Sequence, residues 1–457
     1  MKEYDIIVIG SGAGLDILDT AVEHGHKAAL VDKGPIGGTC LNVGCIPSKM
    51  LIYPADRIMD IQDSARLGID AGIKGIDFAA IMERMHRLVD GDASRIKRYL
   101  KESKDVDFYE DTAEFVEKYT LKVGGKTIRG KQIYLASGSR PLIPPIPGLD
   151  EVDYLTNESL LQLKKVPKSL IVIGGGYVGV EYAHFFAAMG AEVTIIEMGS
   201  RLLPAEEPEI SAFLQLGLAR RMTVHTQCTA ESVEKSADGV VTVNIKQIAA
   251  GQQVQLKAEK LLLAAGRTSN ADLLKVEKGG IATDKQGYIK VDAHMETNLK
   301  GIYAIGDANG REMFTHVSHA EASVAAANGI HGARERMDYW AAPHAIFTHP
   351  QVASVGLTEE AAARKYKVVV GRADYADTAL GAAMMQEEGF AKIILEEGSG
   401  KILGGHIVGP WASVLIQEVV NAMARRGGMN DIARGIHIHP SLSELVVKAV
   451  YDAAGAT

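Results

Sequence analysis

The sequence predicts an α/β protein with two Rossmann-like dinucleotide-binding domains and a separate C-terminal α+β module. A unit of buried strand, glycine-rich turn, helix and second strand occurs twice. The chain after residue 341 has strand and helix patterns without such a turn. The chain has 457 residues, and at roughly 100–200 residues per domain this length corresponds to two to four domains.

The first unit begins with the apolar strand 6–9, passes through the glycine turn 10–14 and a helical stretch, and ends its second strand at Asp32. Asp32 follows Gly10 by 22 residues. A turn of this kind brings backbone N–H groups to a pyrophosphate at a helix N-terminus, and the acid binds a ribose. The third motif position is Leu15, where glycine or alanine usually allows close helix–strand packing. The first turn is therefore the weaker match, and an ordinary α/β turn is its alternative.

The second unit has all three motif glycines. Strand 170–173 leads into Gly174, Gly176 and Gly179, and the next strand ends at Glu197, 23 residues after Gly174. A lone glycine motif is weak evidence, but two copies in the same context predict a pair of dinucleotide-binding units.

Composition and charge exclude several classes of protein. The net charge of −8 argues against a broad nucleic-acid-binding surface, and no apolar run of 18 residues predicts a membrane span. Three cysteines cannot form the disulfide framework of a secreted protein. Because a strand pattern begins within a few residues of Met1, without a signal or transit pattern, we expect a cytoplasmic protein.

Between the two units the patterns are helical and then extended. Residues 50–110 predict amphipathic helices, whose core positions at helical spacing are Met82, Met85, Leu88 and Val89. Short strands are expected at 120–123 and 131–135, and at 412–426 and 441–454 the expected elements are helices. Four prolines within 141–147 predict a stiff linker and a domain boundary.

Two cysteines follow Asp32 closely, in the segment 37–49. In an ideal helix, five residues would leave Cys40 and Cys45 some 140° apart. A bond between them therefore needs a distorted turn, which Asn42 and Gly44 favour. A dithiol beside a bound dinucleotide in a reducing compartment predicts catalysis, and two buried cysteines that merely pack are the alternative. Cys228, without a partner in the sequence, is interpreted as a packing residue.

The segment 37–49 closely resembles the active-site signature of the pyridine nucleotide–disulfide oxidoreductases, especially the dihydrolipoamide dehydrogenase branch. Other segments similar to motifs of this family occur in the same order at 136–141, 263–267, 302–307 and 437–444. The resemblance implies a FAD-binding domain at 1–145 completed by 267–340, an NAD-binding domain at 146–266 and a dimerisation domain at 341–457.

The resemblance also implies the cofactor contacts. The glycines of the first turn would approach the FAD pyrophosphate, Asp32 the adenosine ribose and Asp307 the ribityl chain. The complete set expected for FAD is Gly10, Gly12, Gly14, Asp32, Lys33, Gly38, Thr39, Cys40, Lys49, Ala113, Ser137, Gly138, Asp307 and Thr315. The set expected for NAD is Gly174, Gly176, Gly179, Glu197, Val233 and Gly266. Glu197 favours NAD over NADP, because its charge repels a 2′-phosphate and Arg201 is the only arginine nearby.

In such enzymes the second cysteine, here Cys45, holds a thiolate in charge-transfer contact with the flavin. Cys40 would then exchange with the disulfide substrate. Lys49 would approach the flavin and pair with a glutamate that matches Glu181.

The base of the thiol chemistry would be His439, oriented by a carboxylate that matches Glu444. In this family the partner subunit contributes this pair, which would make a homodimer obligatory. His437 with His439, and His316 with His319, have spacings that also suit metal ligands. No cysteine or carboxylate cluster lies beside them, so we expect no metal site.

The resemblance predicts oxidation of dihydrolipoyl groups with reduction of NAD⁺. The partner would be free dihydrolipoamide or a lipoyl-bearing protein of a 2-oxo acid dehydrogenase or glycine-cleavage complex, with neither nucleic acid nor membrane involved. An NAD(P)H-dependent reductase of another small disulfide, similar to mycothione or glutathione reductases, is the alternative. It is favoured by Leu15, Asp16, Asp19, Tyr53 and the stretch 315–319. A flavin-binding scaffold or redox sensor is a third reading, but it would not need the base.

Overall fold

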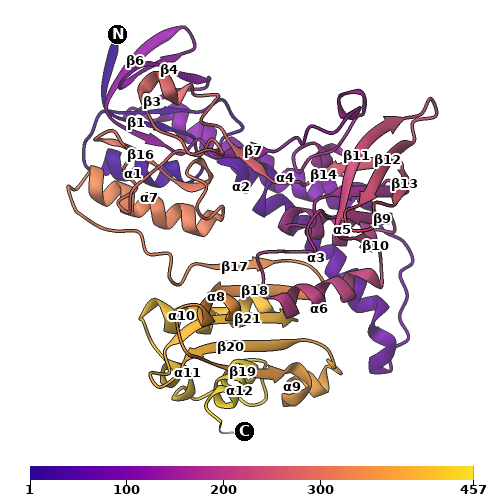
Figure 1. The fold of residues 1–457 in the computed structure, drawn as a ribbon. Helices are drawn as coiled ribbons and strands as arrows, with labels where there is room; N and C mark the ends of the chain where they lie inside the picture. Colours follow the sequence, from indigo (N-terminus) through magenta and orange to yellow (C-terminus); the bar gives the residue numbers. More distant parts are fainter. Residues whose placement is uncertain (456–457) are drawn as a thin grey trace. The chain divides into compact units, whose positions relative to one another are not determined.

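The computed structural model describes residues 1–455, and these form two compact units (Figure 1). The first unit comprises residues 1–50, 82–142 and 266–337, and the second comprises 51–81, 143–265 and 338 onward. One boundary between them falls within the proline-rich stretch 141–147. In the described part of the chain, no helix is long and apolar enough to cross a membrane.

The first unit is built on one mixed sheet in which β1 lies at the centre. The strands run in the order β3-β2-β1-β6-β5-β4, and β16 also pairs with β6. Their bounds are β1 (Lys2–Ile9), β2 (Ala28–Val31), β3 (Val106–Tyr109), β4 (Ala113–Glu117), β5 (Thr120–Val123), β6 (Lys126–Leu135) and β16 (Ile302–Ala304). The strands next to β1 are parallel to it, as a Rossmann-like fold requires.

Both faces of this sheet are covered, so the second half of β1, residues 6–9, is a continuous apolar run. Ile6 and Val8 belong to one buried cluster, and Ile7 and Ile9 belong to another on the opposite face. Helices α1 (Gly14–Glu23) and α7 (Thr315–Gly329) pack against each other. A small antiparallel pair, β7 (Ser139–Pro141) and β15 (Arg267–Ser269), completes the unit.

Three helices follow the first βαβ unit along the chain. They are α2 (Gly38–Val43), α3 (Cys45–Gln62) and α4 (Phe78–Glu102). Three of the four apolar positions expected in the core of α4 are buried, but the prediction for Leu88 was wrong, since it is 42% exposed. Met85 and Val89, four residues apart, share the buried face, and Leu88 lies about 100° around the helix from Val89.

The second unit contains the second nucleotide-binding fold, a parallel sheet in the order β10-β9-β8-β14. Its strands are β8 (Ser169–Ile173), β9 (Glu192–Ile196), β10 (Thr223–His225) and β14 (Lys260–Leu263), with helix α5 (Tyr177–Ala188) between β8 and β9. Between β10 and β14, the chain forms an antiparallel sheet of three strands. These strands are β11 (Cys228–Lys235), β12 (Val241–Gln247) and β13 (Gln253–Ala258). Cys228 is buried in the apolar cluster of this region, which confirms its packing role.

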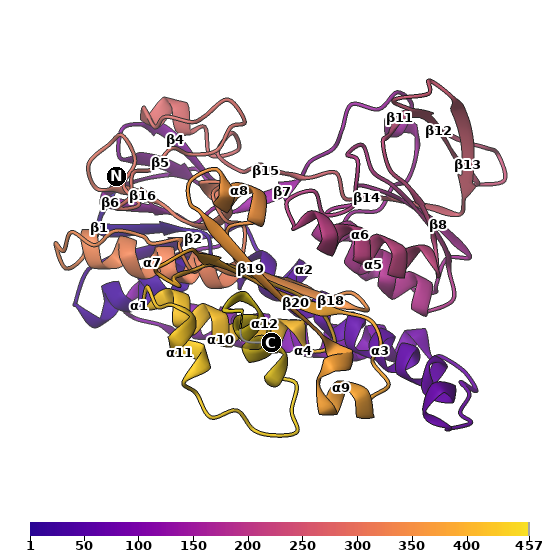
Figure 2. The same cartoon turned by 60° about the horizontal axis from the view of Figure 1, so that its bottom comes forward.

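The C-terminal part of this unit is an antiparallel sheet in the order β17-β18-β21-β20-β19, covered by α10 and α12 (Figure 2). The strands are β17 (Pro343–Ile346), β18 (Gln351–Gly356), β19 (Val368–Asp374), β20 (Phe390–Glu396) and β21 (Ile402–Gly409). The helices are α8 (Glu359–Ala363), α9 (Ala379–Ala383), α10 (Ala412–Ala424), α11 (Met429–Ala433) and α12 (Glu444–Ala453). The predicted α+β module and its two long helices are confirmed.

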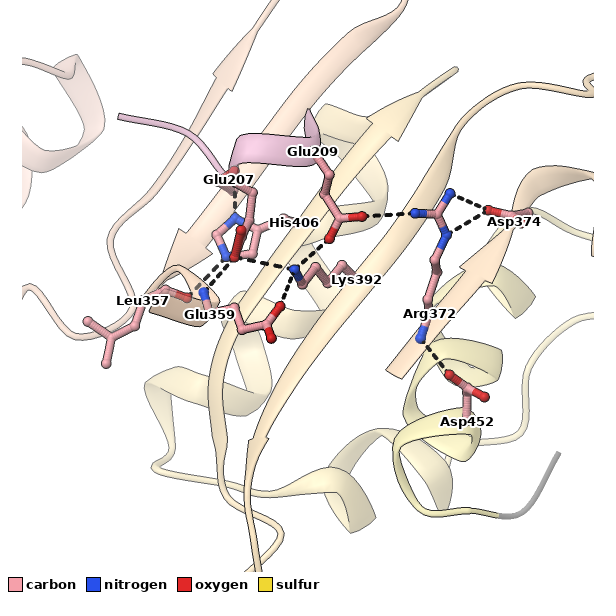
Figure 3. Close-up of polar contacts among 10 residues, drawn as sticks. Glu207, Glu209, Leu357, Glu359, Arg372, Asp374, Lys392, His406 and Asp452 are labelled. Atoms are coloured by element: carbon pink, nitrogen blue, oxygen red, sulfur yellow. Dashed lines mark hydrogen bonds and ion pairs between the residues drawn. The ribbon is translucent and has the colours of Figure 1, made fainter. Parts of the chain in front are cut away.

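Helix α6 (Pro208–Ala219) is tied to this sheet through a buried lysine (Figure 3). Lys392 Nζ lies 2.5 Å from Glu209, 2.6 Å from Glu359 and 3.5 Å from Glu207. Lys392 is 4% exposed and Glu207 1% exposed. Because a buried charge without its partner costs several kcal/mol, on the order of 3–5, this cluster fixes α6 against β20.

Candidate active site

The first glycine turn connects β1 to α1 and contains Gly10, Gly12 and Gly14. A Cβ atom on Gly14 would lie 2.8 Å from Val8 Cγ1, so the close helix–strand contact is made here. Leu15, at the third motif position, is half-buried and packs against the apolar cluster of the same face. The departure at Leu15 is therefore compatible with a dinucleotide-binding turn.

Asp32 is held at the end of β2 by a short network. Its Oδ2 accepts hydrogen bonds from Ser11 N at 2.7 Å and Ser11 Oγ at 2.6 Å, and its Oδ1 accepts one from Gly34 N at 2.7 Å. Ser11 Oγ in turn accepts a hydrogen bond from Gly37 N at 2.8 Å. Ser11 thus links the turn, the acid and the start of the cysteine segment. Ser11 was not predicted, although its place inside the Gly-x-Gly turn was a usable signal.

The residues around this turn fit a bound dinucleotide. Ser137 Oγ is buried, and within residues 1–455 it has no hydrogen-bond partner. An unsatisfied buried hydroxyl is uncommon in a folded protein, and a ligand bound at this turn would supply its partner. The other predicted positions differ in exposure: Ala113 is buried on β4, Gly138 and Thr39 are half-buried, and Lys33 is exposed.

Asp307 follows β16 and is held by two residues of the family-like segments 136–141 and 263–267, for which no separate role was predicted. Ser139 Oγ donates a hydrogen bond to Asp307 Oδ2 at 2.5 Å, and Arg267 Nε donates one to Ser139 Oγ at 2.6 Å. Arg267 Nε is also 3.4 Å from Asp307 Oδ2. This arrangement fixes the carboxylate at the carboxyl end of the sheet, where ligands of open α/β folds bind.

The cysteine segment contains the distorted turn that the spacing predicts. Helix α2 ends before Gly44, whose φ and ψ are −130° and −111°, and α3 begins at Cys45. Asn42 Nδ2 donates hydrogen bonds to Ile36 O at 3.0 Å and Gly38 O at 2.9 Å, which fixes the short helix. Gly38 has a φ of +68°, and a Cβ there would lie 2.7 Å from Gly12 Cα. The cysteine segment therefore rests directly on the backbone of the first glycine turn.

The pKa values of the two thiols of this segment are shifted in opposite directions. Both are free, and Cys45 donates a hydrogen bond to Cys40, which lowers the pKa of Cys40 to about 6. The same bond raises the pKa of Cys45, and burial adds to this increase, while Lys49 acts against it. The two thiols thus share one proton through this bond, and the charge-transfer thiolate expected at Cys45 stays a prediction.

Helix α7 contributes two further residues to Cys40. A hydrogen bond from the Thr315 hydroxyl and the charge of His319 act with Cys45 to lower the pKa of Cys40. His319 Nδ1 is 2.5 Å from Asp16 Oδ2, a contact between α7 and α1. Asp16, one of the departures from the family pattern, is thus connected to the thiols through His319.

The second glycine turn connects β8 to α5. A Cβ on Gly179 would lie 2.0 Å from Gly174 O, so this position needs a glycine, whereas a Cβ on Gly176 would meet no atom within 4 Å. Glu197 accepts hydrogen bonds from Gly175 N at 2.7 Å and Gly199 N at 2.5 Å. Of the remaining positions predicted for NAD, Val233 is buried on β11, and Gly266 is exposed with a φ of +125°.

A buried carboxylate lies beside this turn and was not predicted. Glu206 is 2% exposed and accepts hydrogen bonds from Tyr177 Oη at 2.9 Å, His344 Nε2 at 2.6 Å and Ser354 Oγ at 2.6 Å. Although burial opposes it, the hydrogen bond from His344 keeps the pKa of Glu206 below its usual value. No sequence pattern indicated this residue, because its partners come from distant segments.

The remaining predicted catalytic residues lie in the second unit. Glu181 is buried on α5, and its Oε1 accepts a hydrogen bond from Phe347 N at 2.9 Å. His439 Nδ1 is 2.9 Å from Glu444 Oε1, and this hydrogen bond lowers the pKa of Glu444. His439 and Glu444 are thus in contact, while their role as base and orienting carboxylate and the pairing of Lys49 with Glu181 stay predictions.

Three of the four histidines considered as metal ligands, His319, His437 and His439, contact carboxylates. His437 Nε2 is 2.8 Å from Glu418 Oε1, while His319 contacts Asp16. Across residues 1–455, no group of three or more His, Cys, Asp and Glu side chains is arranged to hold a metal ion.

Two protein-family models match the chain. Residues 4–322 match "Pyridine nucleotide-disulphide oxidoreductase", and residues 342–450 match the dimerisation domain of the same family.

Curated relatives cover almost the whole chain. The mycothione reductase of Mycobacterium tuberculosis (strain H37Rv) is 34% identical over 98% of this chain and 99% of its own. The mitochondrial dihydrolipoyl dehydrogenase of Dictyostelium discoideum is 36% identical over 99% of this chain and 94% of its own. The dihydrolipoyl dehydrogenase of Bacillus subtilis (strain 168) is 34% identical over 99% of this chain and 97% of its own. Among solved structures, the Cu(II) complex of the HOCl-induced flavoprotein disulfide reductase RclA from Escherichia coli is 27% identical, with a TM-score of 0.88 over 98% of this chain and 99% of that chain.

Proposed function

The chain belongs to the pyridine nucleotide–disulphide oxidoreductases, flavoproteins that use FAD and a pyridine nucleotide, and from this premise we propose that it oxidises dihydrolipoyl groups to the lipoyl disulfide while reducing NAD⁺ to NADH. The Cys40–Cys45 pair carries the proposal, because it lies on a broken helix that rests on the first nucleotide-binding turn. Residues 1–145 and 267–340 would bind FAD, residues 146–266 NAD, and residues 341–457 a second subunit.

The exchange chemistry assigns one role to each thiol. A substrate thiolate attacks Cys40 Sγ of the oxidised pair, the Cys40–Cys45 bond breaks, and Cys45 leaves as a thiolate. The second substrate thiol then displaces Cys40, so the substrate's own disulfide forms and two electrons remain on the pair. FAD, when bound, supplies the transfer of these electrons to the nicotinamide.

The His439–Glu444 pair would accept the protons of the substrate thiols. Glu444 holds His439 Nδ1, which leaves Nε2 to take the proton. The His439 side chain is 70% exposed within its own chain, which suits a base that serves the thiols of the partner subunit.

A homodimer is supported by the match to the dimerisation domain. Ile436 and Ile438, which flank the His437 position, are strongly exposed, as are Trp411 and Val414 in the same module. Exposed apolar side chains of this size are typical of a surface that another subunit covers.

Subunit mixing tests this assembly. Neither the C40S nor the H439A homodimer should turn over substrate. Co-expressed subunits should recover about a quarter of the wild-type activity, since half of the dimers then contain one intact site. If the co-expressed subunits recover no activity, the active site is not shared between subunits.

Glu197 supports NAD over NADP. Two backbone N–H groups fix its carboxylate at the end of β9, where it can bind both ribose hydroxyls and repel a 2′-phosphate. Arg201, the arginine nearest in sequence, donates a hydrogen bond to Pro204 O at 3.1 Å.

The deciding experiment is a steady-state assay of the FAD-loaded protein with dihydrolipoamide and NAD⁺, repeated with NADP⁺. Fast NADH formation and little NADPH formation are expected. A flavin that NADH reduces, without turnover of dihydrolipoamide, would contradict the lipoyl substrate but leave the enzyme class intact.

A second candidate substrate is another small disulfide, of the kind that mycothione reductases reduce. It is favoured by the polar Asp16–His319 pair beside Cys40, together with the mycothione reductase relative of similar identity. Oxidation of NADH or NADPH that depends on mycothione, and is faster than turnover of lipoamide, would select this candidate.

A further inference from the structure

Glu206 is a buried carboxylate that the thiol chemistry does not use. It is 2% exposed and lies in the chain just before α6. The segment that carries it rests on the second glycine turn, because Leu203 N donates a hydrogen bond to Gly175 O at 2.9 Å. A Cβ on Gly175 would lie 2.5 Å from Leu202 Cδ2. The backbone therefore places Glu206 beside the turn that we assign to the nicotinamide nucleotide.

The carboxylate of Glu206 accepts hydrogen bonds from three different elements. Its Oε1 accepts from Tyr177 Oη at 2.9 Å and from His344 Nε2 at 2.6 Å, and its Oε2 accepts from Ser354 Oγ at 2.6 Å. Tyr177 is the first residue of α5, whereas His344 lies on β17 and Ser354 on β18. One buried carboxylate thus joins the start of α5 to two strands of the C-terminal module.

Tyr177 is held at its hydroxyl and at its ring. The hydroxyl donates to Glu206, and the ring stacks on the His344 ring with the centroids 5.6 Å apart and the planes inclined by 23°. Since His344 also donates to Glu206, the three side chains form a closed triangle. A side chain that packing and hydrogen bonding hold in this way keeps one rotamer.

Tyr177 follows Gly176 directly, at the N-terminus of α5. A Cβ on Gly176 would meet no atom within 4 Å, so the turn is open at this point. In dinucleotide-binding units the pyrophosphate lies at the N-terminus of the helix that follows the turn. A nucleotide bound to the second turn would therefore lie next to Tyr177.

We propose that Glu206 is a positioning residue that fixes the Tyr177 side chain at the nicotinamide-nucleotide turn and joins this turn to the C-terminal module. The proposal rests on the proposed function, since it concerns the nucleotide of the same reaction. Glu206 lies outside both glycine motifs and acts through Tyr177. Removal of its charge should therefore weaken nucleotide binding and leave the reduction of the flavin by bound nucleotide nearly unchanged.

The test follows reduction of the flavin in the FAD-loaded protein by NADH, without oxygen, in a stopped-flow instrument. The dependence on NADH concentration gives the half-saturating concentration and the limiting rate separately. Glu206→Gln keeps the shape of the side chain and removes its charge. It should raise the half-saturating concentration about fivefold and change the limiting rate by less than about twofold. Tyr177→Phe, which removes one of the three hydrogen bonds, should raise the half-saturating concentration about threefold.

Two comparisons make the result specific. In the Tyr177→Phe background, Glu206→Gln should add less than about twofold, because the bond through which Glu206 acts is already gone. Glu209→Gln is the matched control, since Glu209 belongs to α6 and binds Lys392 and Arg372 of the C-terminal sheet (Figure 3). It loosens α6 from that sheet and leaves the bond between Glu206 and Tyr177 in place, so its half-saturating concentration should equal that of the wild type.

An unchanged half-saturating concentration in both Glu206→Gln and Tyr177→Phe would overturn the proposal. An equal rise in Glu209→Gln, or a full fivefold rise when Glu206→Gln is added to Tyr177→Phe, would overturn it as well. If Glu206→Gln does not fold, Tyr177→Phe decides, because Glu206 then keeps two of its donors.

The readout uses no disulfide substrate, and NADPH replaces NADH if it reduces the flavin faster. Failure of the proposed function would leave dihydrolipoamide without turnover while the four half-saturating concentrations keep the expected order. Failure of this inference would change that order whatever the disulfide substrate is.

Discussion

The two nucleotide-binding turns follow the same sequence plan but have different surroundings. In the first turn, Ser11 Oγ accepts a hydrogen bond from Gly37 N, and Gly12 lies against Gly38. The turn and the cysteine segment are therefore one structure. In the second turn, the Glu197 carboxylate accepts hydrogen bonds from Gly175 N of its own turn and from Gly199 N.

This difference matches two kinds of ligand. A cofactor that stays bound can be part of the support of the catalytic thiols, because it does not leave during turnover. A nicotinamide dinucleotide is a substrate that binds and leaves in each cycle, which suits a turn whose acid is held by nearby backbone N–H groups. We therefore expect damage to the first turn to affect both cofactor and thiols, and damage to the second to affect only the nicotinamide reaction.

The largest effect is expected for Gly38→Ala. Its Cβ would lie 2.7 Å from Gly12 Cα at a φ of +68°, so both the backbone and the turn must shift. We expect loss of most bound flavin, measured as absorbance at about 450 nm per chain, and an altered reactivity of Cys40.

Gly25→Ala is the control for Gly38→Ala. Gly25 has a similar φ of +72°, but a Cβ there would meet no atom within 4 Å. It should lower the free energy of unfolding by only about 1 kcal/mol and keep its flavin. Equal flavin loss in the two variants would show that backbone strain, not contact with the first turn, decides the outcome.

The second turn should give a separate phenotype. Gly179→Ala forces a Cβ to within 2.0 Å of Gly174 O, so α5 must move away from the turn. We expect the KM for NAD⁺ to rise about tenfold or more while the flavin content stays normal.

Gly176→Ala separates packing from ligand contact at the same turn. Its Cβ meets no protein atom, so thermal unfolding should match that of the wild type while the KM still rises. A loss of flavin in either variant would contradict the independence of the two turns.

Local pattern predicted much of this molecule. The two βαβ units, their acids and the break between Cys40 and Cys45 depend on short-range features, namely strand patterns, glycine spacing and the residues per turn of a helix. Leu88 was misplaced for a local reason as well, since helical spacing alone does not decide which of two adjacent apolar residues faces solvent.

The sequence does not predict hydrogen-bonded pairs whose two residues come from distant segments. His319 reaches Asp16 over 303 residues, and Glu206 accepts hydrogen bonds from Ser354 over 148 residues. Such pairs depend on how α1 and α7, or α6 and the C-terminal sheet, pack together. No periodicity in the chain encodes that packing.

Ser11→Ala tests the first turn with a smaller expected effect than the glycine variants. The hydroxyl both donates to Asp32 and accepts from Gly37 N, and Ser11 is 1% exposed, so its removal leaves a buried N–H unpaired. We expect the free energy of unfolding to fall by about 1–3 kcal/mol and flavin to dissociate faster. Denaturant titration and dilution of the holoenzyme measure the two effects, and unchanged flavin release would mean that Ser11 does not couple the acid to the cysteine segment.

The smallest effect is expected for Glu197→Gln, which keeps the shape of the second acid and removes its charge. A glutamine oxygen can still accept a hydrogen bond from Gly175 N or Gly199 N, so the turn should stay folded and the flavin bound. The charge that repels a 2′-phosphate is lost, so the ratio of kcat/KM for NAD⁺ over NADP⁺ should fall by about tenfold. The matched change in the first turn is Asp32→Asn, which should lower flavin retention and leave this ratio unchanged in the molecules that keep their flavin. If instead Asp32→Asn alters the nucleotide preference, or Glu197→Gln releases flavin, the two acids do not serve separate ligands.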